Sequence, residues 1–567
     1  MDSLAAESST SKFVAERSAI LGDIDVYLRR IINLKTHLNT FTHINRLPNE
    51  VLGQILVVYA RDHYRSATRD RDKSGSTSPQ WIKLAHVCRH WREVALGTPR
   101  FWSHVYVRRL GTFSALLSLS KSSPLHVDLT LQQYSCSDFG TWISATDLIG
   151  QESHRLREFI CVANLKQFRT LGEKLSPPMR FLEMLALSES QWGDQDEDDS
   201  QPFHILPATG HTPRLRHLEL RELPVVWTDP VFCPTLTTLV VTGKADQHAA
   251  SSIGTGTFEQ LLDALQAMAP SLVHLTLENS VPPLQSSTAE PPLPNRSIAL
   301  TSLQTMSINC NTNDCVHLMD HLSINPVAKI DVTGSGGSGI QRLVEILSGH
   351  VSRSAPLLGL KISFPNRAST SKVTITGYED TNFRRQVFDS DGGPPLNLTL
   401  SIPWTGGAQE RPLTAVLKAA HKLFSRVQTL YMYSNVYGGF DVPWLTLFAC
   451  AQSVQTLDIS GHPGTRFFKA LCDVRQVKGE QSSVTCVPLV RLRELKLGDV
   501  RFRDSMWRPN EHNAGKFFHG LLDWVILRCN YGIPLERLRL LQCEYATARD
   551  IRRIEQIVVQ VEWDQWE

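Results

Sequence analysis

The feature that most constrains the fold of this chain is a short apolar signature that recurs twelve times after residue 150. Each copy spans six residues and is apolar at its first, fourth and sixth positions, as in LRHLEL from Leu215. Alternation at the end of each copy predicts a strand, and recurrence at intervals of roughly 20 to 70 residues, most near 30, predicts stacked repeats. The copies begin at Leu156, Leu182, Leu215, Leu236, Leu272, Leu303, Val327, Leu357, Val427, Val454, Leu492 and Leu535.

Amphipathic stretches between these copies predict helices at 258–269, 341–350, 413–424, 444–452, 467–474 and 516–529. One strand with one helix buries too little apolar surface to be stable alone, so the units must stack. The pattern resembles leucine-rich repeats of irregular length, with the usual Asn or Cys after the strand present only loosely. We therefore predict an α/β fold in which residues 106–567 form a curved leucine-rich-repeat solenoid. Its parallel strands lie inside, its helices lie outside, and a helix over 546–564 caps its C-terminal end.

A different pattern lies upstream of the repeats. Pro48 and Glu50 stand where a helix can begin, and the apolar positions that follow predict an amphipathic helix, namely Val51, Leu52, Ile55, Leu56 and Tyr59. A second helix is predicted from Trp81, Leu84, Ala85, Cys88, Trp91 and Val94, and Gly97 with Pro99 ends it. Two short helices form too small a core to be self-sufficient, so we expect a docking module.

The residues of this helical block resemble the F-box family, in its fullest form the large F-box families of mushroom-forming fungi. The resemblance is carried by Leu47-Pro48, Val51-Leu52, Ile55, Val87-Cys88-Arg89, Trp91-Arg92 and Phe101-Trp102. That family couples a target protein to a ubiquitin ligase through the Skp adaptor. The resemblance implies a module over 44–105, with adaptor-binding residues Leu47, Pro48, Val51, Leu52, Ile55, Leu84, Val87, Cys88 and Trp91.

A polar insert at about 61–80 separates the two helices and is longer than the compact motif allows. We interpret it as a solvated loop that leaves the helix pair intact, because loop length costs stability only logarithmically. A phosphorylatable segment at Ser74, Ser76, Thr77 and Ser78 is the alternative.

Residues 1–43 carry one long amphipathic helix. Its apolar residues follow steps of mostly three or four positions, at Val14, Ile20, Ile24, Leu28, Ile31, Leu34, Leu38 and Phe41. This spacing fits a coiled coil with a second copy, or a helix that folds back onto the helical block. We favour the fold-back, because the run is barely four heptads long and lacks matched charges at the flanking positions.

Composition restricts the partners of the chain. A formal net charge of +2 lacks the excess of Lys and Arg that nucleic-acid-binding proteins usually have. The N-terminus has no basic segment before an apolar stretch, and no apolar run approaches the length of a membrane span. The 11 cysteines are scattered without a repeated spacing, which favours reduced thiols. We therefore expect a cytoplasmic or nuclear protein with no nucleic-acid and no membrane partner.

Three further patterns suggest chemistry, and each has a structural interpretation that fits better. GSGGSG at 334–339 has the spacing of a dinucleotide-binding turn, but the acidic residue that would bind the ribose is missing, so a flexible turn is expected. The set Cys310, Cys315, His317 and His321 lacks the spacing of a zinc finger. The acidic run at 194–199 predicts a solvated loop, with recognition of a basic peptide as the alternative.

Together these patterns predict a receptor without catalytic residues, metal or cofactor. Its partners would be a Skp-type adaptor, through it a cullin, and an unknown target protein, with the chain a monomer within this hetero-complex. A repeat-based interaction scaffold not linked to ubiquitin transfer is the alternative. Target contacts are expected from the spacer positions of the predicted strands, chiefly Arg216, Glu219, His274, Tyr431, Asp458, Arg493, Lys496 and Arg537.

Overall fold

The structure is a computed structural model of the chain. It describes residues 2–69, 80–106, 110–130, 139–175, 179–190, 212–244, 256–283, 296–336, 339–354, 356–364, 370–381, 396–403, 410–434, 443–461, 463–464, 466–478, 483–502 and 516–564. The chain divides into two compact units, which we describe separately. The first comprises Met1–Asp196 with Ile205–Leu215, and the second comprises Glu197–His204 with Arg216–Glu567.

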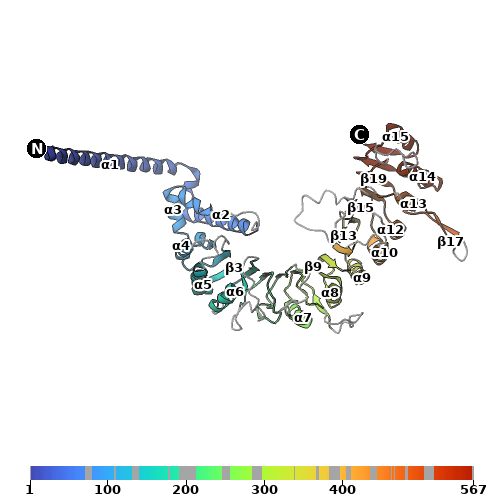
Figure 1. The fold of residues 1–567 in the computed structure, drawn as a ribbon, viewed down its shortest axis with the longest axis horizontal. Coiled ribbons are helices and arrows are strands. Elements are labelled where there is room, and N and C mark those ends of the chain that lie inside the picture. The colour runs from blue at the N-terminus through green and yellow to red at the C-terminus, as the bar shows by residue number, and fades with distance from the viewer. Residues whose placement is uncertain are drawn as a thin grey trace. The chain divides into compact units, whose positions relative to one another are not determined.

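The first unit begins with helices (Figure 1). They are α1 (Asp2–Thr40), η1 (His43–Arg46), α2 (Asn49–Arg69), η2 (Gln80–His86), α3 (Arg89–Leu96) and η3 (Pro99–Trp102). The predicted helix after Pro48 is confirmed as α2. The single helix predicted from Trp81 is wrong, because Cys88 has an extended backbone with φ −157° and separates η2 from α3.

The polar insert is also partly corrected. Its first residues, up to Arg69, continue α2 as a helix instead of forming a loop. Helix-forming residues such as Ala60, Arg61 and Arg65 extend α2 without interruption. Residues 70–79, with the four Ser and Thr positions considered above, lie outside the described part of the chain.

The prediction that the N-terminal helix folds back is wrong. Every side chain described between Phe13 and Leu38 on α1 is exposed, including the apolar ones. Helix α1 ends at Thr40, and η1 begins three residues later. The side-chain amide of Asn45 in η1 donates a hydrogen bond to the carbonyl of Asn39 in α1 over 2.8 Å.

The first unit continues as alternating strands and helices. Four parallel strands pair in chain order, β1 (His104–Tyr106), β2 (Leu125–Thr130), β3 (Leu156–Ala163) and β4 (Met184–Glu189). The connections contain α4 (Leu110–Ser120), α5 (Phe139–Glu152), η4 (Ser153–Arg155) and α6 (Leu165–Lys174). The repeat signature identified β3 and β4 but missed β1 and β2, which therefore extend the parallel array up to the helical block.

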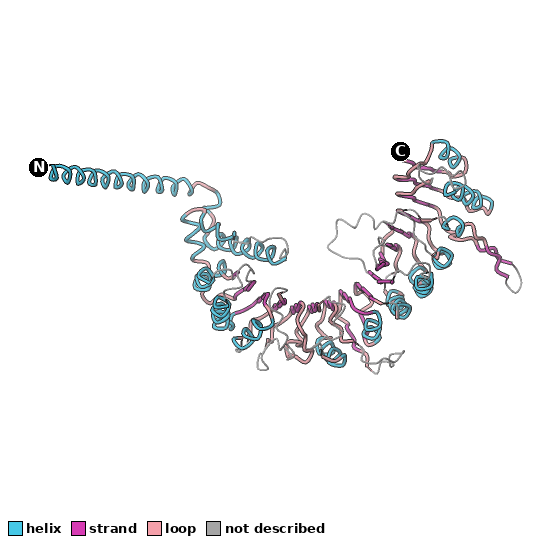
Figure 2. Tube along the Cα trace, in the orientation of Figure 1, coloured by secondary structure: helices cyan, strands magenta, loops and turns pink. Residues whose placement is uncertain are grey.

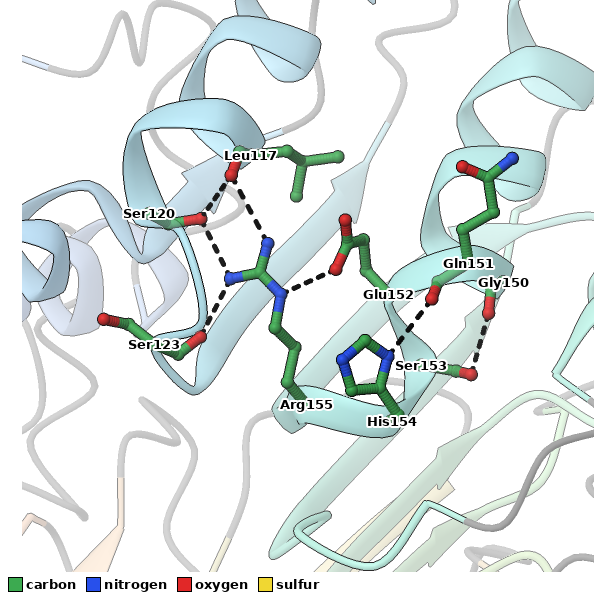
Figure 3. Close-up of polar contacts among 9 residues, drawn as sticks. All are labelled: Leu117, Ser120, Ser123, Gly150, Gln151, Glu152, Ser153, His154 and Arg155. Carbon is green, nitrogen blue, oxygen red and sulfur yellow. Dashed lines mark hydrogen bonds and ion pairs between the residues drawn. The ribbon is translucent and has the colours of Figure 1, made fainter.

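A buried arginine joins two of these repeats (Figure 3). Arg155 donates from Nη1 to Oγ of Ser120 over 3.0 Å and to the carbonyl of Ser123 over 2.9 Å, so it satisfies groups at the C-terminal end of α4. Its Nε donates to Oε2 of Glu152 over 2.7 Å. A cation at a helix C-terminus is favoured by the helix dipole, and the carboxylate compensates the buried charge.

The second unit contains one large, mostly parallel sheet. Each of its ten signature copies supplies a strand that begins two residues after the first apolar residue. In chain order the signature strands are β5 (His217–Arg221), β6 (Thr238–Thr242), β7 (His274–Glu278), β9 (Thr305–Asn311), β11 (Lys329–Ser335), β12 (Gly359–Phe364), β15 (Thr429–Ser434), β16 (Thr456–Ser460), β19 (Glu494–Gly498) and β20 (Arg537–Leu541).

The sheet departs from chain order at one place. Strands β13 (Thr370–Tyr378) and β14 (Leu396–Pro403) insert between β11 and β12. There β14 pairs with β11 in parallel, β13 is antiparallel to both β14 and β12, and β12 pairs in parallel with β15. A regular succession of repeats was predicted here, and the antiparallel pair interrupts it.

Helices cover one face of this sheet (Figure 2). They are α7 (Phe258–Met268), α8 (Thr312–Asp320), α9 (Ile340–Val351), α10 (Glu410–Ala419), α11 (His421–Phe424), α12 (Trp444–Cys450), α13 (Arg466–Leu471), α14 (Lys516–Asn530) and α15 (Ala548–Glu555). Two small pairs lie outside the main sheet, β8 (Ile298–Leu300) with β10 (Leu322–Ile324) and β17 (Arg475–Lys478) with β18 (Ser483–Cys486).

Two predictions about connections need correction. The predicted outer layer of helices is interrupted between β5 and β6, where buried Trp227, Val231 and Phe232 occupy a connection without a helix. The predicted C-terminal helix ends at Glu555, and residues Gln560–Trp563 form the strand β21, parallel to β20. Pairing with β21 covers the edge of β20, which would otherwise expose unpaired backbone groups.

Alternation along the strands separates the core from an open face. On β5, Leu218 and Leu220 are fully buried on the helix side, whereas Glu219 between them is on the opposite face. The same alternation holds on β7, β9 and β20. None of the helices in the described part of the chain is both long and apolar enough to cross a membrane.

Candidate functional site

Helix α2 has two apolar faces with different surroundings. Leu52, Leu56, Ala60 and Tyr64 follow one another at four-residue steps and are almost completely buried. On another side of the helix, Val51 and Ile55 are each 41% exposed, Val58 is 45% exposed and Tyr59 is 48% exposed. We call these four residues the α2 stripe. A helix that is apolar beyond its core-facing side indicates a second surface for burial.

A small aromatic core holds the buried face of α2. The ring of Trp81 lies 4.8 Å from that of Phe101 and 5.8 Å from that of Trp102, both in edge-to-face arrangements. Such pairs contribute beyond their buried area. The indole Nε1 of Trp102 donates to the carbonyl of Ala95 over 2.7 Å. The residues before and after α3 are thereby fixed, and the helix pair has a defined geometry despite its small size.

Glycine allows the close approach of α2 and α3. A Cβ atom built on Gly53 would lie 2.9 Å from Oγ1 of Thr98 and 3.8 Å from Cγ1 of Val94. The Thr98 hydroxyl is itself held, because it donates to the carbonyl of Val94 over 2.7 Å. A larger residue at position 53 would therefore force Thr98, two residues after the end of α3, to shift.

The predicted adaptor-binding residues fall into three groups. Pro48, Val51, Ile55 and Val87 are exposed, so their side chains are available to a partner. Leu47, Leu84, Cys88 and Trp91 are half-buried. Leu52 is fully buried and can only support the surface from below. Their assignment to adaptor binding stays a prediction.

Sequence reasoning missed part of the exposed surface. It did not select Val58, and it placed Tyr59 on the core-facing pattern, although both lie on the α2 stripe. Ile44 and Leu96 are also exposed apolar residues of the block, at 41% and 45%. The sequence does contain a sign of this second apolar side. Residues 55–60, ILVVYA, form an uninterrupted apolar run, and one core-facing side of a helix cannot accommodate all six of them.

Buried polar rings connect α2 to the first strands. The hydroxyl of Tyr106 donates to the carbonyl of Tyr64 over 3.1 Å. The rings of His104 and His126 are stacked with centroids 4.6 Å apart, and Nδ1 of His126 lies 3.0 Å from Oε2 of Glu158. Burial, together with the neighbouring His126, lowers the pKa of His104 to about 3. For Glu158, burial acts to raise the pKa, but the interaction with His126 outweighs it and the net pKa is lowered.

The open face of the second unit carries a continuous row of side chains across the sheet. The strand registers place thirteen residues next to one another, and we call them the central row. They are Glu219, Val240, Thr276, Ser307, Asp331, Asn397, Thr376, Lys361, Tyr431, Asp458, Lys496, Arg539 and Glu562.

Hydrogen bonds order the middle of the central row. The amide of Asn397 donates to Oδ1 of Asp331 over 3.0 Å, and the hydroxyl of Thr376 donates to Oδ1 of Asn397 over 3.2 Å. Burial raises the pKa of Asp331 although the bond from Asn397 opposes the shift. Next to them, Nζ of Lys361 lies 5.6 Å from the centre of the Tyr431 ring, a cation–π distance.

The predicted target-binding residues do not all share this row. Glu219, Tyr431, Asp458 and Lys496 lie in it, and the register places His274 and Arg537 one row away. Asp458 is only 5% exposed. Arg216 and Arg493 precede their strands, where their carbonyls accept from the next repeat. Their role in target binding stays a prediction.

A charged cluster lies at the C-terminal end of the row. Oε1 of Glu494 is approached by three cationic groups: Nε of Arg539 at 3.2 Å, Nζ of Lys496 at 3.7 Å and Nη1 of Arg537 at 3.8 Å. Arg539 also pairs with Glu562 at 2.9 Å. This end of the open face therefore carries charges of both signs, and Asp458 lies next to Lys496 in the central row. The site prediction named Lys496 and Arg537 at this end but did not include Glu562, which pairs with Arg539.

The other chemical patterns form structural features. In GSGGSG the first two residues end β11, Gly336 follows at φ +98°, and Gly339 precedes α9 at φ +79°, while residues 337–338 lie outside the described part of the chain. Cys310 and Cys315 are buried, and their interaction together with burial raises the pKa of Cys310. Within the described ranges, no three His, Cys, Asp or Glu side chains are placed to hold a metal ion. The acidic run 194–199 lies outside those ranges.

Comparison with known proteins identifies the helical block. The family described as F-box-like matches residues 44–108, which include α2, η2, α3, η3, β1 and all of η1 but its first residue. The chain therefore carries an F-box-like domain, and domains of this family typically bind Skp-type adaptors. No curated protein matches the chain.

Proposed function

We propose that the chain is the substrate-recognition subunit of a Skp/cullin/F-box ubiquitin ligase. The F-box-like domain would bind a Skp-type adaptor, and the sheet of the second unit would bind the target. The observation that carries the proposal is the α2 stripe, an exposed apolar surface within the residues that the family matches. Apolar patches on a rigid scaffold mark sites of protein association.

The rigidity of the domain supports this role. Helix α2 contacts η2, η3 and α3, the rings of Trp81 in η2 and Phe101 in η3 pack edge to face, and Gly53 lies against Thr98 and Val94. The stripe is thus presented without further ordering, which lowers the entropic cost of binding. Burying the four stripe residues would give the adaptor complex a central apolar contact of the kind that dominates protein interfaces.

We infer that the strand and helix units are irregular leucine-rich repeats that form a curved solenoid with the open face of the sheet on its inner side. Apart from β11 and β12, which β13 and β14 separate, consecutive signature strands of the second unit pair in parallel, and they bury the apolar residues of their signatures on one face of the sheet. The central row then provides the target-binding surface. Its polar and aromatic side chains, such as Tyr431 and Lys361, suit a protein ligand.

In this proposal the chain is not an enzyme. It holds the target so that a lysine lies near the charged conjugating enzyme, and the gain comes from effective concentration. We place this activity in the cytoplasm or nucleus. No disulfide joins any two of the nine cysteines whose side chains the structure describes, which agrees with a reducing compartment.

Affinity capture of the full-length chain tests the proposal. The intact chain should recover a Skp-type adaptor, a cullin and a target, whereas the Leu47→Ala/Pro48→Ala variant should lose adaptor and cullin but keep the target. A Tyr431→Ala/Lys496→Ala variant should show the reverse. Recovery of the adaptor without a cullin would support an interaction scaffold instead, and unchanged capture by every variant would refute both site assignments.

A further inference from the structure

Helix α1 exposes an apolar surface along most of its length. It spans 39 residues from Asp2 to Thr40, and Phe13 is 70% exposed, Leu34 62% and Leu38 67%. An isolated helix with such a surface is unfavourable in water, because helices gain most of their stability from packing an apolar face. The helix therefore requires a partner, and its sequence indicates which one.

The apolar residues follow a strict heptad pattern. Ile20, Ile24, Tyr27, Ile31, Leu34, Leu38 and Phe41 are separated by steps of four and three in regular alternation. A repeat of 3.5 residues predicts a left-handed coiled coil. In heptad notation Ile24, Ile31 and Leu38 occupy a positions, and the other four residues occupy d positions. When the heptad pattern is continued towards the N-terminus, Phe13 falls at a d position and Arg17 at an a position.

The flanking g positions are acidic in the N-terminal half of the helix and hold an arginine and a histidine in the C-terminal half. They hold Glu16 and Asp23 in the N-terminal half and Arg30 and His37 in the C-terminal half. In a parallel pair each g residue faces the e residue of the next heptad, so Arg30 would face Lys35 of the second copy and repel it. A parallel pair of copies therefore gains nothing from these charges.

In an antiparallel pair the g residues face each other, and the charges match. When Ile24 of one copy packs against Tyr27 of the other, Asp23 faces Arg30 and Glu16 faces His37 of the second copy. The two-fold axis repeats each pair. The same register packs Ile20 against Ile31 and Phe13 against Leu38, and it brings Leu21 next to Leu28 at the e positions.

Neighbouring registers are disfavoured. A shift of one heptad places Asp23 opposite Asp23 or Arg30 opposite Arg30 of the second copy, and it leaves only one kind of favourable pair, Glu16 with Arg30 or Asp23 with His37. It also shortens the overlap, which in the matched register runs from Phe13 to Leu38 over about 39 Å. Charge pattern and apolar pattern thus select the same arrangement.

We propose that this chain forms a homodimer through an antiparallel coiled coil of α1, with Ile24 packed against Tyr27 of the second copy. The matched charges that were missing from a parallel arrangement are present in this one. Because the F-box-like domain follows α1 directly, the dimer would carry one such domain at each end of the coil. A dimeric receptor could hold two adaptors, and two target-binding surfaces would act with avidity.

Sedimentation equilibrium of the full-length chain tests the proposal. The intact chain should be a dimer whose dissociation constant rises at least about 30-fold in the Ile24→Asp/Ile31→Asp variant, since two buried layers are lost. Val26→Asp is the matched control. Val26 is also an exposed apolar residue of α1, at 58%, but it occupies a c position outside the seam, so its variant should dimerise normally. A chain that is monomeric at every concentration would overturn the proposal.

Charge reversal distinguishes the two orientations. In the antiparallel dimer Arg30→Glu faces Asp23 of the second copy and should weaken association by about tenfold, counting two pairs per dimer. The double variant Asp23→Arg/Arg30→Glu restores both pairs and should recover the original affinity. In a parallel dimer Arg30→Glu would instead face Lys35 and tighten association, a result that contradicts the proposed arrangement. Adaptor binding plays no part in these measurements, so they stand apart from the proposed function.

Discussion

The indole Nε1 of Trp91 donates a hydrogen bond to Oδ1 of Asn45 over 2.7 Å. These residues are 46 positions apart, and the bond ties η1, immediately before α2, to α3. Pro48 lies three residues after Asn45 at the start of α2, so the bond also positions the beginning of the helix that carries the α2 stripe. The orientation of the proposed adaptor surface therefore depends on a polar contact as well as on the aromatic core.

Removal of this bond should destabilise the first unit. Asn45→Ala and Trp91→Phe should each lower the free energy of unfolding by about 1 kcal/mol, because each leaves one half-buried group without its partner. The double variant should lose less than the sum, since the two substitutions remove the same bond. Denaturant unfolding measures the cycle, and strictly additive effects would show that the bond contributes nothing.

Substitution of Gly53 should disturb the contact between α2 and Thr98. Gly53→Ala should destabilise the domain by about 1–3 kcal/mol although alanine is the better helix former, because its Cβ would lie 2.9 Å from Oγ1 of Thr98. Thr98→Ala in the same chain should recover part of the loss. Gly22→Ala on α1 is the control, since a Cβ there meets no atom within 4 Å, and it should be neutral or stabilising.

Acid should destabilise the junction at His104. The folded state lowers the pKa of His104 from 6.5 to about 3, so the unfolded chain binds a proton more readily. The contribution of neutral His104 to the free energy of unfolding is therefore full well above pH 6.5, and it decreases as the pH falls from 6.5 towards 3. Between pH 7.5 and 5.5 the loss should be about 1.4 kcal/mol.

His104→Phe isolates this contribution. It keeps a ring beside His126 and removes the titrating group, so its unfolding free energy should depend less on pH across the same window. The lowered pKa of Glu158 affects stability only as the pH falls below the ordinary 4.5 of a glutamate, which separates the two groups. An equal pH dependence of the variant and the natural chain would argue against the buried, neutral state of His104.

Arg528 should be essential for the C-terminal repeats. It is 1% exposed, and its guanidinium donates to the carbonyls of Leu489 over 3.1 Å and Leu492 over 2.6 Å. Arg528→Met should destabilise the second unit by about 2–3 kcal/mol, because two buried carbonyls lose their donors. Arg491→Met, at an exposed position nearby, should change stability by less than about 0.5 kcal/mol. Thermal unfolding of both variants makes the comparison.

Local periodicity was sufficient to locate the strands of the repeats. Every signature copy formed a strand because its alternating apolar residues can be buried only on one face of a sheet. The pairing of β14 with β11 was not predictable in the same way, because it joins segments more than 60 residues apart with no local pattern to specify the partner. No signature copy lies between Leu357 and Val427, so no strand was predicted in the interval that contains β13 and β14.

The C-terminal strand and the α2 stripe show two other limits. Ile551, Ile554 and Val558 have helical spacing, so one helix over 546–564 was predicted, yet the open edge of β20 makes a strand at Gln560–Trp563 more favourable. On α2 the resemblance supplied Val51 and Ile55, whereas Val58 required knowledge of which side of the helix the aromatic core covers. In each case tertiary packing selects between local patterns.

Direct binding of a Skp-type adaptor to the full-length chain tests the central claim. The intact chain should bind the purified adaptor, and Ile55→Asp should weaken binding by at least about 30-fold, because a charge would be buried at the centre of the interface. Ile143→Asp provides the matched control, since Ile143 is a 37% exposed isoleucine on α5 of the same unit, outside the family-matched residues. Titration calorimetry should show its affinity unchanged. Absence of binding by the intact chain, or equal affinities for the intact chain and Ile55→Asp, would contradict the account.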